Sequence, residues 1–110
     1  MEGDLRDELL TVAETWVVKQ DGEVVAFMSI IEQLIGGLFT HPGRQGYGHG
    51  RALVEHARLL HDPVFVEVFE ANVKAIGFYR SCGFVDHQRR TDEESEFPML
   101  ILRLKIPRSP

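Results

Sequence analysis

The segment from Arg44 to Arg51 constrains the fold of this chain most, because three of the five consecutive residues 46–50 are glycines: Gly46, Gly48 and Gly50. The segment stands directly before a stretch with helical spacing of apolar residues. A loop with so few side chains lets backbone N–H groups approach a ligand closely, and the start of a helix favours a ligand with negative charge. The sequence therefore predicts a phosphate site where this loop enters a helix.

Apolar periodicity predicts helices and strands on both sides of the loop. Asp21-Gly22 is typical of a tight hairpin turn between two strands. Asn72 can cap the N-terminus of a helix with its side chain, and Gly83 is typical of the residue that ends such a helix. We expect helices over residues 3–12, over about 12 residues from near Gly48, and from Asn72 to Gly83, with strands over residues 15–19, 23–31, 35–40, 64–69, 84–90 and 97–106.

This order of elements predicts an α/β (α+β) fold in which helices cover one sheet. The strand over residues 35–40, the helix after it and the strand over residues 64–69 form a strand–helix–strand unit, so the two strands should be parallel neighbours. Gly36-Gly37 inside the first strand indicates a bulge or the close approach of another backbone or a ligand. A length of 110 residues fits one domain over residues 1–110.

Composition excludes several classes of protein. The formal net charge of −5 argues against a nucleic-acid binder and mildly favours cationic partners such as amines. No apolar run is long enough to span a bilayer, so no membrane contact is expected. A single cysteine and an N-terminus without a signal-peptide pattern predict a cytoplasmic protein. The five histidines lack metal-ligand spacing, so we expect no metal.

Two common nucleotide-binding patterns fail on the glycine loop. The P-loop of nucleoside triphosphatases needs Lys and then Ser or Thr after its last glycine, whereas Gly50 is followed by Arg51 and Ala52. The dinucleotide fingerprint needs glycines at its first, third and sixth positions, and here the last glycine comes one place early.

A third pattern fits. The run Gln45-Gly46-Tyr47-Gly48-His49-Gly50 resembles the Q/R-x-x-G-x-G/A pyrophosphate loop of the GCN5-related N-acetyltransferase (GNAT) superfamily. About 22 residues later, the run from Asn72 to Phe84 resembles the family's second motif, N-x-x-A-x-x-F-Y-x-x-x-G-F. The resemblance covers roughly residues 13–106. It implies a GNAT-like, mostly antiparallel sheet with a central parallel pair that splays apart, and acetyl-CoA as cosubstrate.

The resemblance also implies which residues contact the cofactor. Loop amides and the helix dipole would hold the pyrophosphate, with Arg44 and Arg51 able to add charge. The strand backbone from Gly36 to Thr40 would hold the pantetheine arm, unless Gly36-Gly37 is an ordinary bulge. Asn72 would contact that arm or support the separation of the two strands. A residue that only caps the helix would give the same sequence pattern. The expected cofactor-binding residues are Leu38, Phe39, Thr40, Gln45, Gly46, Tyr47, Gly48, His49, Gly50, Arg51 and Asn72.

Tyr79 is the expected catalytic residue. A tyrosine at this position of the family protonates the departing thiolate, and the alternative is a tyrosine that only packs against the sheet. Tyr79 follows Asn72 by seven residues, so the two project from nearly the same helix face. A phenol in a cleft of low dielectric can donate to the sulfur as it leaves. Cys82 falls at an apolar position and is expected to be a small buried side chain, not a nucleophile.

The attacking amine must also lose a proton, and four side chains near strand ends could accept it, although each is more readily a surface or structural residue. These candidates for the general base are Glu32, His41, Glu67 and Glu70.

We expect an N-acetyltransferase that moves an acetyl group from acetyl-CoA to a primary amine of a small molecule or peptide. The family's usual first strand and first helix have no counterpart in the sequence, so a noncatalytic acyl-CoA-binding or interaction module with a truncated acceptor site is the alternative. A fragment or degenerate copy is a third interpretation. Without those elements the strand over residues 15–19, with Trp16, Val17 and Val18, becomes an exposed sheet edge, and we expect a homodimer that covers it.

Overall fold

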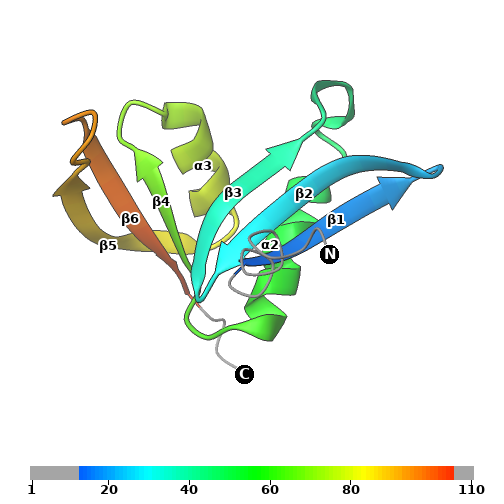
Figure 1. Cartoon of the computed structure of the whole chain (residues 1–110), viewed down its shortest axis with the longest axis horizontal. Coiled ribbons are helices and arrows are strands. Elements are labelled where there is room, and N and C mark those ends of the chain that lie inside the picture. Colours follow the sequence, from blue (N-terminus) through cyan, green and yellow to red (C-terminus); the bar gives the residue numbers. More distant parts are fainter. Residues whose placement is uncertain (1–12, 106–110) are drawn as a thin grey trace, which may run out of the picture.

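The computed structural model describes residues 13–105 as a six-stranded sheet with two α-helices (Figure 1). The predicted α/β (α+β) fold is confirmed, and the helix expected over residues 3–12 lies outside the described residues. The elements are β1 (Ala13–Gln20), β2 (Glu23–Ile31), β3 (Leu34–Thr40), the 3-10 helix η1 (Pro42–Arg44), α2 (His49–Leu60), β4 (Phe65–Phe69), α3 (Val73–Ser81), β5 (Phe84–Thr91) and β6 (Pro98–Leu104).

The hairpin between β1 and β2 turns at the predicted two residues. Asp21 and Gly22 both have positive φ angles, 53° and 81°, and Gln20 pairs with Glu23 across the turn. Such turns match the twist of the flanking strands, and glycine adopts the positive φ without steric cost. The two-residue turn therefore sets the register of the pairs next to it, and a bulge then shifts the register between Val18 and Lys19.

The strands lie in the order β1-β2-β3-β4-β6-β5, and only β3 and β4 run parallel. These two strands pair at Leu34 with Phe65 and at Ile35 with Val66, and then diverge, as Figure 1 shows. The predicted bulge is also present, because Ser29 pairs with Gly37 while Ile30 pairs with Ile35, which leaves Gly36 as the extra residue. A V-shaped opening between β3 and β4 results.

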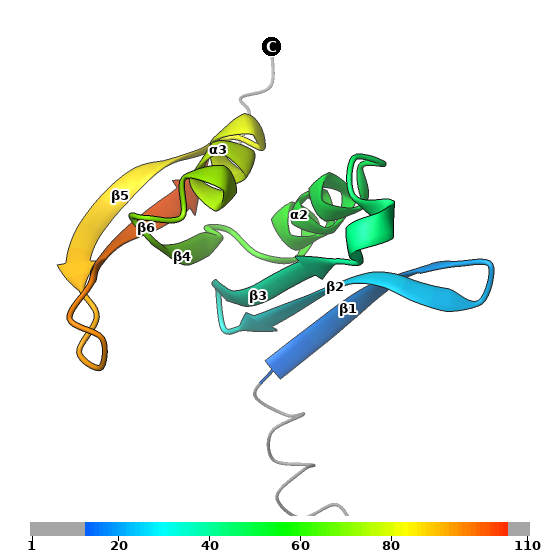
Figure 2. The ribbon, with the colours of Figure 1, turned by 90° about the horizontal axis from the view of Figure 1, so that it is seen from above.

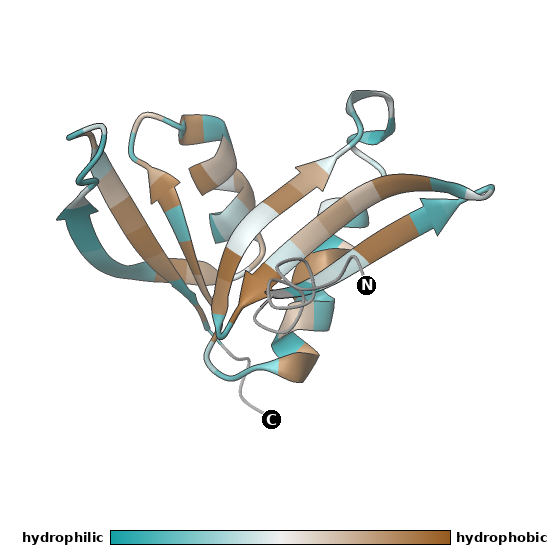
Figure 3. Cartoon of the chain, in the orientation of Figure 1, coloured by the Kyte–Doolittle hydropathy of each residue, from teal (hydrophilic) through white to brown (hydrophobic). Residues whose placement is uncertain are grey.

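Both helices cover the same face of the sheet (Figure 2). Apolar residues run along β2, β4 and β6 (Figure 3), and alternate residues of these strands point into the core. The fully buried side chains include Met28 and Ile30 of β2, Val54 of α2 and Leu102 of β6. Among the described residues, no helix is long and apolar enough to cross a membrane.

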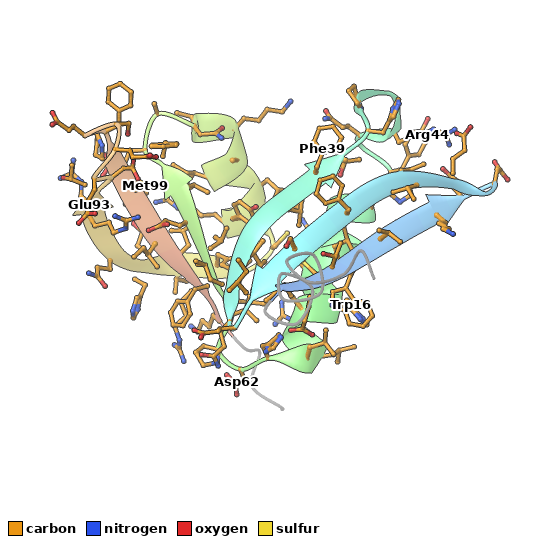
Figure 4. All side chains as sticks on the ribbon, viewed as in Figure 1. Trp16, Phe39, Arg44, Asp62, Glu93 and Met99 are labelled. Atoms are coloured by element: carbon orange, nitrogen blue, oxygen red, sulfur yellow. The ribbon has the colours of Figure 1, made fainter. Side chains whose placement is uncertain are left out.

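The other face of the sheet carries no described helix, and we call it the helix-free face. Val17, Phe27 and Phe39 form a row across β1, β2 and β3 on this face, because they pair with one another in register. All three are exposed, and the two phenylalanine rings lie 5.7 Å apart. Among the described strands β1 lies at one edge of the sheet, as predicted. Trp16 and Val18 differ from expectation, since they pack against the core and leave Val17 exposed. Trp16 lies beside α2, where its ring meets that of His56 (Figure 4).

Candidate active site

A pocket of about 610 Å³ lies where β3 and β4 separate, between the glycine loop and α3. We call it the cofactor pocket. Its residues come from the end of β3, the loop with the first turn of α2, and the exposed side of α3. They are Leu38, Thr40, Gln45, Gly46, Gly48, His49, Gly50, Arg51, Asn72, Lys74, Ala75, Phe78 and Tyr79.

The structure thus brings most of the sequence-predicted cofactor residues into one pocket, with two exceptions. Phe39 lies on the helix-free face, because neighbouring residues of a strand point to opposite sides, and only its backbone remains available to a ligand in the opening. Tyr47 is 71% exposed, and its ring lies beside that of His49 outside the pocket. Their part in cofactor binding stays a prediction.

The three loop glycines are required for two different reasons. Gly46 and Gly48 have φ angles of 91° and 87°, and a Cβ atom at either position would meet nothing within 4 Å. Conformation therefore explains these two glycines, and the space beside them is open. Gly50 has an ordinary φ, but a Cβ atom there would lie 3.0 Å from Phe78 Cζ. Gly50 therefore lets the start of α2 approach α3 closely.

The arginines beside the loop are held by protein groups. Arg44 lies outside the pocket, where it donates to Gln20 Oε1 at 2.6 Å and reaches Glu23 at 4.0 Å beside the hairpin (Figure 4). Arg51 lines the pocket, yet it donates to both the carbonyl and the hydroxyl oxygen of Ser81 at 3.1 and 3.0 Å. Arg51 therefore ties the start of α2 to the end of α3 across the pocket.

Asn72 begins α3 as a cap. Its Oδ1 accepts a hydrogen bond from the backbone N–H of Ala75 at 3.2 Å, which satisfies one of the free donors at the helix start. The same residue lines the cofactor pocket. The helix cap is confirmed, and contact of Asn72 with the cofactor arm stays a prediction that its place in the pocket lining supports.

Tyr79 lies at the wall of the cofactor pocket with only 7% of its surface exposed. Its ring meets Phe78 and Phe84 edge to face at 5.2 and 5.3 Å, which fixes its orientation. Burial raises the pKa of Tyr79 to about 12, with a smaller contribution from neighbouring Cys82. The phenol therefore keeps its proton at physiological pH and is available as a donor.

Cys82 is buried, as predicted, with 4% of its surface exposed. Burial raises the pKa of the thiol, and the nearby charge of Arg51 opposes that shift without reversing it. A neutral buried thiol is a poor nucleophile, so Cys82 serves as a packing residue. Within residues 13–105 no group of three or more His, Cys, Asp or Glu side chains is arranged to hold a metal ion.

A second pocket, of about 310 Å³, opens between strands on the helix-free face. We call it the acidic pocket, because two of the four base candidates, Glu32 and Glu67, line it. The other two are engaged elsewhere: Nδ1 of His41 accepts from the N–H of Gly43 at 3.1 Å, and Glu70 pairs with Arg89. Glu67 is also paired, with Arg90, so Glu32 is the candidate in a cavity without an ion pair within residues 13–105, and the identity of the base stays a prediction.

Sequence reasoning missed His87 in the acidic pocket and Lys74 in the cofactor pocket. His87 stands at a break in register, where Asp86 and Gln88 pair with consecutive residues of β6, so alternation along β5 could not place it. Lys74 occupies an unspecified position of the second motif. Its place in the first turn after the Asn72 cap was the available signal.

Comparison with known proteins agrees with this geometry. Residues 12–86 match a family model described as an acetyltransferase (GNAT) domain. The chain is 31% identical over 99 residues to the peptidyl-lysine N-acetyltransferase YiaC of Escherichia coli K12, with 89% of this chain and 68% of that protein covered. It is 35% identical over 102 residues to the peptidyl-lysine N-acetyltransferase YjaB of the same strain, with coverage of 92% and 69%.

Solved structures show the same fold. The apo form of YjaB from Escherichia coli superposes with a TM-score of 0.73 at 35% identity, covering 90% of this chain and 71% of that one. An IAA acetyltransferase from Bacillus cereus ATCC 14579 gives 0.78 at 20% identity, covering 93% and 83%. An acetyl-CoA-bound GNAT acetyltransferase from Elizabethkingia anophelis gives 0.76 at 17% identity, covering 93% and 82%. The chain therefore belongs to the GNAT family, the N-acetyltransferases that use acetyl-CoA as cosubstrate.

Proposed function

We propose that this protein acetylates the side-chain amine of lysine in peptides or proteins. The charge of the acidic pocket carries the proposal. Glu32 and Glu67 line that pocket and no lysine or arginine does, although Arg90 pairs with Glu67 from outside the lining, so Glu32 supplies its unpaired charge. The cofactor pocket has Arg51 and Lys74 and no acid among its described lining residues. One cavity thus suits an anionic cofactor and the other suits a cationic amine. The two curated relatives from Escherichia coli described above, both named peptidyl-lysine N-acetyltransferases, support this substrate class.

The position of the two pockets supports transfer through the sheet. Ile35 and Val66 are the last paired residues before β3 and β4 separate, and Leu34 and Phe65, the pair before them, line the acidic pocket. An acetyl group at the inner end of the cofactor pocket would thus approach the acidic pocket. Phe65 and Glu67 alternate with buried Val66, so they face the helix-free side. Donor and acceptor would enter from opposite faces.

The carboxylates would prepare the amine for attack. A lysine amine of ordinary pKa near 10.4 is protonated at neutral pH and must lose a proton before it attacks the thioester carbonyl. Glu67 is paired with Arg90, and Glu32 has no ion pair within residues 13–105. Glu32 would accept the proton directly or through a water molecule. Formation of the C–N bond and loss of the C–S bond would then leave an amide and the coenzyme A thiolate, which would take its proton from the phenol of Tyr79 at the pocket wall.

The experiment is an acetyl-CoA-dependent assay of thiol release with a peptide that contains one internal lysine and a blocked N-terminus. We expect turnover with this peptide and none when arginine replaces the lysine. Glu32→Gln should lower kcat/KM by about 10²-fold, the usual size of a positioned base. Glu93→Gln, at an exposed position in the turn before β6, should leave it unchanged.

Two results would overturn the proposal. Acetylation confined to polyamines or aminoglycosides would assign a small-molecule acceptor. Tight binding of acetyl-CoA without turnover on any amine would favour the noncatalytic module.

We also propose a homodimer in the cytoplasm. The open edge of β1 and the exposed row Val17, Phe27 and Phe39 lie together, and such surfaces favour association. We expect sedimentation at micromolar concentration to show a dimer, and Val17→Glu to dissociate it. Leu59→Glu on α2, where Leu59 is 81% exposed, should have no effect. A monomeric wild-type protein would contradict this proposal.

Two observations support the cytoplasmic location. The enzyme needs acetyl-CoA as cosubstrate, which the cytoplasm supplies, and the single cysteine leaves no internal disulfide that would need an oxidising compartment.

A further inference from the structure

Lys74 stands where a positive charge is unfavourable for the fold. It lies in the first turn of α3, directly after the cap and N1 residues, and that turn contains no acid. The N-terminal end of a helix carries partial positive charge, so a lysine there is disfavoured unless an anion balances it. Within residues 13–105 Lys74 forms no ion pair. Its side chain lines the cofactor pocket.

Lys74 also differs from the other cations near the pocket. Arg51 uses both terminal nitrogens on Ser81, and Arg44 points to the hairpin outside the pocket. No Asp or Glu side chain is among the described residues that line the pocket, so none of them balances the charge of Lys74. Neither Arg51 nor Lys74 has an ion pair within residues 13–105, but Arg51 is held by its hydrogen bonds to Ser81. Lys74 is therefore the lining cation whose ammonium the described protein leaves free to meet an anion.

Coenzyme A carries two anionic parts, the pyrophosphate and the ribose 3′-phosphate. The amides of residues 46–50 and the start of α2 suit the pyrophosphate, because helix N-termini bind such groups through backbone N–H. Lys74 projects from the facing helix, on the other side of the pocket. We propose that the ammonium of Lys74 binds the 3′-phosphate and so makes this protein prefer coenzyme A over 3′-dephospho-coenzyme A. The inference rests on the family's cosubstrate and not on lysine as acceptor.

Calorimetric titration with coenzyme A and with 3′-dephospho-coenzyme A tests this assignment without any turnover. We expect the wild-type protein to bind coenzyme A about five- to tenfold more tightly, as one charge-assisted contact to phosphate predicts. Lys74→Gln should remove this preference by weakening coenzyme A alone. Lys74→Arg should keep most of it. The preference should also decline as salt is raised, because an exposed ion pair is screened.

Lys19→Gln is the matched control, because Lys19 is an exposed lysine of β1 that does not line the pocket. It should leave both affinities unchanged. Lys74→Gln should not lower the free energy of unfolding, since it removes a charge that the helix dipole disfavours. Equal weakening of both ligands by Lys74→Gln would assign Lys74 to the pyrophosphate and overturn the proposal. An unchanged preference in Lys74→Gln would also overturn it. A failed lysine-peptide assay would leave this binding result standing, so the two proposals are tested separately.

Discussion

Tyr79→Phe should lower kcat by about 10²-fold while the affinity for acetyl-CoA stays within a factor of two, in line with the usual contribution of a positioned proton donor. The substitution keeps the ring that packs between Phe78 and Phe84 and removes only the hydroxyl. The departing sulfur then loses the donor that stabilises its charge. Steady-state kinetics of thiol release measure kcat, and calorimetric titration with acetyl-CoA in the absence of an acceptor measures the affinity.

The raised pKa of Tyr79 also predicts a pH profile. Because burial moves that pKa to about 12, the phenol stays protonated from neutral pH to well above 9, and loss of its proton does not limit the rate there. Burial beside the tyrosine should raise the pKa of the coenzyme A thiol as well, which keeps donor and acceptor matched. Activity should therefore rise with pH as the acceptor amine loses its proton. Tyr79→Phe should keep this rise at a lower level.

Tyr47→Phe provides the control for Tyr79→Phe. Tyr47 is the other tyrosine of the chain, and it is exposed beside the loop and outside the pocket. We expect its loss of a hydroxyl to leave kcat unchanged. If Tyr79→Phe kept full turnover, or if it weakened acetyl-CoA as much as it lowered kcat, Tyr79 would be a packing or binding residue and the assigned proton donor would be wrong.

Local signals were sufficient to predict most of the fold. The Asp21-Gly22 turn, the Asn72 cap and the stop at Gly83 all appear where the sequence indicates them, because each depends on residues close in the chain. The parallel pairing of β3 and β4 followed from the handedness and length of the connection between them. The resemblance implied that the two strands splay apart, but no local signal indicated that the pairing would end at Ile35 and Val66.

The cofactor pocket was largely predictable, because its glycines and Asn72 belong to two recognisable motifs. The acidic pocket was not, since Glu32, Glu67 and His87 come from three segments that only the sheet order brings together. The hydrogen bonds from Arg51 to Ser81 could not be predicted either, because the two residues are 30 positions apart in the sequence. Side-chain contacts between segments far apart in the chain therefore could not be predicted from the sequence.

Gly48→Ala should weaken coenzyme A by about 10- to 100-fold, the loss expected when one or two amide hydrogen bonds to a charged phosphate are misplaced. Gly48 caps α2 with a φ of 87°, and its carbonyl accepts the first helical hydrogen bond, from Ala52, at 3.0 Å. A Cβ atom at such a φ costs about 1–2 kcal/mol, so the loop should relax to another conformation. Its amides would then no longer converge on the pyrophosphate. Calorimetric titration with coenzyme A measures the change.

Gly22→Ala separates this effect from a general loss of stability. Gly22 has a φ of 81°, and a Cβ atom there would also meet nothing within 4 Å, so both variants carry the same kind of backbone strain. We expect both to lower the free energy of unfolding by about 1–2 kcal/mol, and only Gly48→Ala to weaken coenzyme A. Equal affinities in the two variants would mean that the pyrophosphate does not depend on the amides of this loop. Because the strain is matched, any difference in affinity between the two variants comes from the place of Gly48 beside the ligand.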